Sequence, residues 1–141
     1  MKTALVTGAA RGIGRATADA LEKSGLRVLR LDLQSEISYD LTNLAGIPKL
    51  IDSLGEIDVL VNNAGVQNAV SIDQYTDEQR SRILRVNLEA PVELIRAVSK
   101  QMVRRKGRPE EVAEAIRWLA VDAPEILNGA VIDVTDGCFL R

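Results

Sequence analysis

The feature that most constrains the fold is a glycine-rich turn near the N-terminus, residues 8–14 with the sequence GAARGIG. It follows a short apolar run at residues 3–7 and precedes a stretch with apolar side chains at helical spacing, which ends at Gly25. A strand that turns through glycines into a helix directs unpaired amide groups and the positive end of the helix dipole at one point, where a phosphate can bind. Such turns also serve as plain strand-to-helix connections, so the turn alone leaves both interpretations open.

Beyond this turn the chain alternates strand-like and helix-like segments. Short apolar or β-rich runs predict strands at residues 3–7, 27–31, 36–39, 57–61 and 130–134. Helices are expected after the glycine turn, from Pro48 to Leu54, from Thr76 onward and from Pro109 onward. This order predicts an α/β fold: a Rossmann-like, doubly wound parallel sheet of about five strands, in three α/β/α layers. We expect the last strand to lie beside the fourth strand or to pair with another chain.

The longest predicted helix begins at Thr76. Thr76 and Gln79 have the spacing of a capping box, and Pro91 is expected to kink the helix. The apolar residues that can share one face of it are Ile83, Val86, Ala90, Leu94, Val98 and Met102.

Composition limits the kind of protein that this fold can serve. The 141 residues fit a single domain, and 46% apolar with 27% charged residues are typical of a globular chain. A net charge of −2 gives no positive field for nucleic acid or anionic lipid, and no run approaches the roughly 18 apolar residues of a membrane span. The chain has no histidine, which excludes His-based triads and zinc sites, and its single Cys138 cannot form an internal disulfide. We therefore expect a cytoplasmic protein without nucleic-acid or membrane partners.

An acidic residue closes the second predicted strand. Asp32 lies 18 residues beyond Gly14, where a carboxylate can accept both hydroxyls of an adenosine ribose and would repel a 2′-phosphate. This favours NAD over NADP as the cofactor. Two cations, Arg11 and Arg30, could offset the repulsion, and Asp32 could also simply start a turn.

Four motifs, in this order, resemble those of the short-chain dehydrogenase/reductase family: residues 7–14 (TGAARGIG), 40–42 (DLT), 62–65 (NNAG) and 86–88 (VNL). Residues 107–113 and 128–134 are similar to the last helix and strand of the same family. The resemblance implies one dinucleotide-binding domain over residues 1–141. Its N-terminal part would occupy residues 1–106, and its C-terminal helix and strand residues 107–141.

The resemblance also implies where a nicotinamide dinucleotide, or its adenosine half, would bind. The glycine turn would hold the pyrophosphate, and Asp32 the ribose. Asp40 and Leu41 would contact the adenine, and Asn63 with Ala64 the edge of the cofactor. The predicted cofactor-binding residues are Gly8, Arg11, Gly12, Ile13, Gly14, Asp32, Asp40, Leu41, Asn63 and Ala64. NAD is expected rather than NADP, and no metal site is predicted.

Asn87 matches the family's catalytic asparagine, whose backbone carbonyl holds a water in a proton relay. Pro91 has no N–H and cannot bond the carbonyl of Asn87 four residues back, which would leave that carbonyl free for such a water. The alternative is an ordinary mid-helix kink in which Asn87 satisfies its own neighbours.

The family's catalytic Ser and its Tyr-x-x-x-Lys motif are not found in this chain. Tyr39 is followed four residues on by Asn43, and Tyr75 by Gln79, so neither tyrosine has the lysine that would lower its pKa. The segment that would carry these groups is missing after Lys106. We therefore expect an NAD(H)-binding protein of an oxidoreductase family that is catalytically impaired in this form.

Two alternatives to this interpretation stay open. The chain could be a shortened or incompletely represented form of an active NAD-dependent alcohol/carbonyl oxidoreductase, or it could be a non-enzymatic interaction module. In each case the loss of two central strands would bare apolar helix surface and a sheet edge, which favours a homo-oligomer.

Overall fold

The computed structural model describes residues 1–102 and 109–127, and the fifth predicted strand, at residues 130–134, lies outside them. Met1–Met102 form one compact unit, and a second unit begins at Val103. The first unit holds the described strands and the glycine turn. The single domain expected over residues 1–141 stays a prediction.

The first unit is built on a parallel sheet with the strand order β3-β2-β1-β4. Its elements are β1 (Thr3–Thr7), α1 (Gly12–Lys23), β2 (Arg27–Asp32), β3 (Ile37–Ser38), α2 (Ile47–Leu54), β4 (Val59–Val61), α3 (Asp77–Leu84) and α4 (Ala90–Met102). β1 lies in the middle, with Thr3 opposite Arg27 of β2 and Val6 opposite Val61 of β4. The expected Rossmann-like α/β fold is confirmed, with four strands in the described residues.

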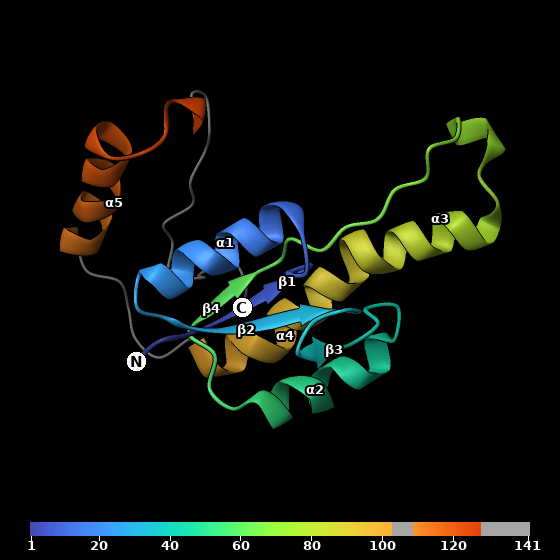
Figure 1. Ribbon diagram of the computed structural model, residues 1–141, viewed down its shortest axis with the longest axis horizontal. Coiled ribbons are helices and arrows are strands. Elements are labelled where there is room, and N and C mark those ends of the chain that lie inside the picture. Colours follow the sequence, from blue (N-terminus) through green and yellow to red (C-terminus); the bar gives the residue numbers. More distant parts are fainter. Residues whose placement is uncertain (103–108, 128–141) are drawn as a thin grey trace. The chain divides into compact units, whose positions relative to one another are not determined.

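Helices cover both faces of this sheet. α1 lies on one side, and α2 and α4 lie on the other (Figure 1). Successive side chains of a strand point to opposite faces, so Val6 packs with Ala18 of α1, whereas Leu5 packs in the larger cluster with Ile51 and Leu94. All five residues of β1 are buried. The central strand therefore holds the two cores together, and its carboxyl end places the glycine turn.

β4 begins two residues later than predicted. The amide of Ile57 donates a hydrogen bond to Oε1 of Gln101, at 3.0 Å. Only at Asp58 does the backbone join β1, with its amide donating to the carbonyl of Thr3 at 2.8 Å. A side chain from the distant helix α4 thus replaces the first expected contact of the strand.

The long helical stretch begins as predicted. The hydroxyl of Thr76 accepts from the amide of Gln79, and the Gln79 side chain accepts from the amide of Thr76, which completes the capping box. Between α3 and α4 lies a π-helical turn, Arg85–Glu89, which ends two residues before Pro91. The buried residues of the stretch are Val86, Ala90, Leu94 and Val98. Ile83 is half-buried, and Met102 is exposed.

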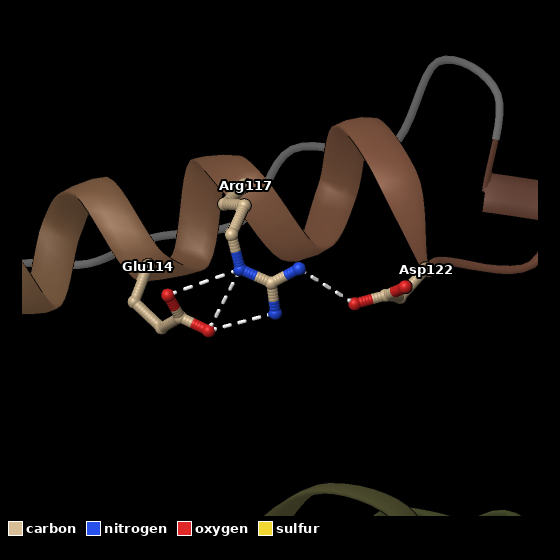
Figure 2. A network of polar contacts seen from close by, with 3 residues as sticks. All are labelled: Glu114, Arg117 and Asp122. Atoms are coloured by element: carbon tan, nitrogen blue, oxygen red, sulfur yellow. Dashed lines mark hydrogen bonds and ion pairs between the residues drawn. The ribbon is translucent and has the colours of Figure 1, made fainter.

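The second unit is described from Pro109 to Leu127. α5 (Pro109–Val121) begins at a proline, as expected, and none of its residues is buried in the described part of the chain. Figure 2 shows Arg117 between two carboxylates: its guanidinium donates to Glu114 at 2.8 Å and to Asp122 at 2.9 Å. The hydrogen bond and charge of Arg117 hold the pKa of Glu114 below its usual value. Among the described helices, none is long and apolar enough to cross a bilayer.

Candidate dinucleotide site

The glycine turn between β1 and α1 requires glycine for two different reasons. Gly8 and Gly12 have φ angles of +67° and +57°, a region that side chains with a Cβ rarely adopt. Gly14 is helical, but a Cβ there would collide with the backbone carbonyl of Gly8 and with Nδ2 of the Asn63 side chain. The first turn of α1 is thus drawn tightly against the end of β4, and its free N–H groups open at the end of the sheet.

A buried hydroxyl ties this turn to β4. Thr7, 1% exposed, accepts from the amides of Asn63 and Ala64, each at 3.0 Å, and donates to the carbonyl of Val61. The Asn63 side chain donates in the opposite direction, to the carbonyls of Thr7 and Gly8. A hydroxyl has one donor and two acceptor positions, and all three are used here.

The carboxyl ends of the strands border a groove with a volume of about 440 Å³. Nine of the ten predicted cofactor-binding residues line it: Gly8, Arg11, Gly12, Ile13, Asp32, Asp40, Leu41, Asn63 and Ala64. The tenth, Gly14, is behind the turn, where it allows close packing. A groove that combines a glycine turn at the start of a helix with the carboxylates of Asp32 and Asp40 fits the phosphates and ribose of a dinucleotide.

Asp32 connects the end of β2 to the glycine turn. One oxygen of its carboxylate accepts from the amide of Ala10 and the other from the amide of Gln34, each at 3.3 Å. These contacts hold the side chain at the edge of the groove. The other acidic residue of the groove, Asp40, accepts from both the amide and the hydroxyl of Thr42, and these bonds, more than the charge of Arg82, hold its pKa below the usual value.

Arg30 does not lie in this groove. Its guanidinium is held on the α1 side of the sheet by Asp19 at 2.7 Å and by Glu22 at 2.8 Å. Of the two cations that could offset the charge of Asp32, Arg30 is therefore paired elsewhere, and Arg11 alone lines the groove.

Some residues of the groove were not predicted from the sequence. Tyr39 lines it beside Asp40, and burial raises the pKa of its phenol. Arg82 and Val86 reach it from the long helix. Val86 belongs to the VNL motif, and Arg82 lies one helical turn before it. This spacing from a recognised motif is the signal that could have identified both residues.

Asn87 lies outside this groove, in the wall of a neighbouring hollow. Its side chain pairs with the backbone of Val66: Oδ1 accepts from the amide and Nδ2 donates to the carbonyl, both at 2.8 Å. The side chain thus fastens the loop after β4 to the π turn.

Comparison with known proteins agrees with this geometry. The model of the short chain dehydrogenase family matches residues 2–41 and 36–108, which is more than half of the chain. The chain belongs to the short-chain dehydrogenase family. The chain is 36% identical over 121 residues to a sorbitol dehydrogenase of Cereibacter sphaeroides, in a match covering 72% of this chain and 47% of the relative.

Solved structures of the family show the same fold. A metagenomic short-chain oxidoreductase in complex with NADP matches with a TM-score of 0.68 and 30% identity, covering 72% of this chain and 57% of that one. A 4-hydroxyisoleucine dehydrogenase complexed with NADH matches with a TM-score of 0.66 and 28% identity, over 71% and 49%. The chain spans about half the length of the curated relatives that it matches.

Proposed function

We propose that this chain binds NAD, chiefly through the adenosine half and the pyrophosphate. The observation that carries the proposal is the groove itself, in which the glycine turn, Asp32, Asp40 and Asn63 line one hollow. The amides of the turn would take the pyrophosphate, and the carboxylate of Asp32 the ribose hydroxyls. Asp40 and Leu41 would contact the adenine, and Ala64 the edge of the cofactor.

The preference for NAD over NADP rests on the charge at the ribose. Asp32 would lie against a 2′-phosphate, and the charge of Arg30 is already taken by Asp19 and Glu22. Arg11 is the remaining cation that the groove offers beside Asp32. One structural neighbour of the chain is complexed with NADH and another with NADP. Because similarity favours neither cofactor, the proposed preference for NAD rests on the residues of this groove.

We further propose that this chain alone does not transfer hydride. The Tyr-x-x-x-Lys motif is absent from its sequence, and neither of its tyrosines has a lysine four residues on. In this proposal Asn87 keeps the family's position without a proton relay to serve. A second candidate, an active NAD-dependent alcohol/carbonyl oxidoreductase of which this is a shortened form, is favoured by relatives about twice as long. An intact mass above that of the 141-residue chain supports the second candidate.

Self-association belongs to the same proposal. Large apolar side chains stand exposed along α3, the π turn and α4, among them Leu88 at 57% and Val92 at 53%. Covering such a stripe with a second copy removes it from water. Light scattering that gives the mass of a single chain at all concentrations contradicts this part of the proposal.

The function is tested by calorimetry with NAD, ADP-ribose and NADP. We expect NAD and ADP-ribose to bind with similar dissociation constants, between about 1 μM and 1 mM, because the nicotinamide contributes little. Asp32→Ala is expected to weaken the binding of NAD about tenfold and to reduce the difference between the dissociation constants of NAD and NADP. Asp52→Ala, an exposed carboxylate on α2, is the matched control.

The outcomes separate the parts of the proposal. No binding of any of the three ligands contradicts the proposed function. NAD binding much tighter than ADP-ribose contradicts recognition through the adenosine half. Substrate-dependent production of NADH by the pure chain contradicts the proposal that it is inactive.

A further inference from the structure

A second hollow, with a volume of about 550 Å³, lies beside the dinucleotide groove. The two share part of their walls: Arg11, Gly65, Val66 and Arg82 line both. The second hollow extends from there between the loop after β4, which contributes Asn68, and the long helix, which contributes Asn87. It therefore adjoins the groove without being the part assigned to the adenosine.

The two hollows differ in charge. The dinucleotide groove contains the carboxylates of Asp32 and Asp40. The residues that line the second hollow include two guanidinium groups and no carboxylate, in a chain whose net charge is −2. Within residues 1–102 and 109–127, neither Arg11 nor Arg82 takes part in an ion pair. The lining of the second hollow itself thus carries positive charge without a carboxylate, although the charge of Arg82 also acts on Asp40 in the neighbouring groove.

A buried donor adds an independent observation. Nδ2 of Asn68 is shielded from solvent and has no hydrogen-bond acceptor among the described residues. Burying an amide donor without a partner is unfavourable. Asn68 lines the second hollow, so a turn of its side chain would bring this donor to a ligand there.

We propose that the second hollow binds an anionic group, a carboxylate or a phosphate, of a molecule that lies beside the dinucleotide. Guanidinium groups form planar, charge-assisted hydrogen bonds with such groups, and the Asn68 amide supplies a further donor. The inference rests on the proposed function, since it names the chemical class of the second ligand at the same site. The experiment distinguishes this separate molecule from the other source of the same chemistry, the phosphates of the dinucleotide itself.

The test is a titration of the isotope-labelled chain with inorganic phosphate, with malonate as the carboxylate probe, at constant ionic strength set by sodium chloride. Nuclear magnetic resonance follows the side-chain amide of Asn68 and the Nε–H of Arg82. One arm uses the chain saturated with NAD, and the other uses the chain without NAD. We expect saturable shifts in the millimolar range in both arms.

Variants separate the hollow from general charge attraction. Arg82→Ala is expected to weaken phosphate at least about tenfold, and Arg82→Lys, which keeps the charge but loses the planar fork, to weaken it less. Arg80→Ala is the matched control, because Arg80 lies on the same helix and pairs with Asp77 in solvent. We expect it to leave the phosphate affinity unchanged. Arg82→Lys also keeps the test valid if Arg82→Ala does not fold.

Several results would overturn the inference. Shifts that stay linear and match those with chloride mean that no site exists, and equal affinities of the parent and Arg82→Ala mean that the site lies elsewhere. Displacement of phosphate by NAD means that the phosphates of the dinucleotide occupy the hollow. Saturable phosphate binding without any NAD binding supports the anion site while contradicting the proposed function, and normal NAD binding without phosphate saturation does the reverse.

Discussion

Two segments border the dinucleotide groove, and they are held in very different ways. The turn after β1 is fixed by two side chains that make five hydrogen bonds to the backbone around them: three by the hydroxyl of Thr7 and two by the side-chain amide of Asn63. The loop after β4, residues 66–75, is fastened at Val66 by the side chain of Asn87, which is exposed. Farther along, its Tyr75 hydroxyl donates to the carbonyl of Asn68 at 3.3 Å.

The difference teaches how this site divides its tasks. Backbone groups that are buried and fully bonded cannot move without losing several hydrogen bonds at once, so the turn keeps its shape before any ligand arrives. The loop has few such bonds, and opening it costs little. The part of the ligand common to all dinucleotides would thus meet the rigid turn, whereas the second hollow borders the loosely held loop.

The largest expected effect comes from a methyl group in the rigid segment. In Gly14→Ala the new Cβ would collide with the carbonyl of Gly8 and with the Asn63 side chain. Because one of these obstacles is backbone, relief requires moving the turn, and we expect a loss of more than about 3 kcal/mol in the free energy of unfolding, together with loss of NAD binding. Urea denaturation followed by circular dichroism measures the change.

The control for this substitution lies two residues earlier. A Cβ at Gly12 meets nothing within 4 Å, although the φ of this residue is +57°. Gly12→Ala therefore reports backbone strain without collision, for which we expect about 1–2 kcal/mol. A cost for Gly12→Ala as large as that for Gly14→Ala would show that close packing is not what distinguishes the turn.

The next effect concerns the buried hydroxyl. Thr7→Val keeps the shape of the side chain but leaves the amides of Asn63 and Ala64 without their acceptor. Two unpaired amides predict a loss of about 2 kcal/mol in the free energy of unfolding. Thermal and urea denaturation measure it, with Thr7→Ser as the control that retains the hydroxyl. If Thr7→Val and Thr7→Ser are equally stable, the hydroxyl does not hold the turn.

The residues of the rigid segment are also those that the sequence predicts best. Gly8 is needed for the positive φ of the turn, and Asn63 bonds to the backbone of the same turn. A local motif is therefore sufficient to find both residues. Asp32 was likewise predicted, because it closes a strand at the edge where parallel strands end together. The alternation of strands and helices was predictable for the same reason, since each element has its own period of apolar residues.

What the sequence did not predict depends on contacts between distant segments. Arg82 becomes part of the groove only because the long helix returns to the sheet, and β4 starts late only because Gln101 takes the amide of Ile57. Pro91 predicts a kink in the helix but not the π turn that the structure has there, and no local pattern predicts the hydrogen bonds from Asn87 to Val66. Such features follow from packing, which a single sequence does not display.

The smallest expected effect comes from the loosely held loop. Asn87→Ala removes both hydrogen bonds to Val66, but the groups that lose their partners are near solvent and can bond to water instead. We expect a loss of about 1 kcal/mol or less in the free energy of unfolding, and little change in the affinity for ADP-ribose. The local effect should be larger: hydrogen exchange at the amide of Val66 is expected to become at least about fivefold faster.

The control is Asn62→Ala, because Asn62 is an exposed asparagine of the NNAG motif whose loss is expected to leave this exchange rate unchanged. The pair of variants decides whether the two segments are held independently. If Asn87→Ala accelerates exchange at Asn63 and Ala64 as much as at Val66, the loop and the turn open together. That result contradicts the claim that the turn is held independently of the loop. If only Val66 and the loop respond, the turn keeps its geometry through its own buried bonds, as the full use of the Thr7 hydroxyl requires.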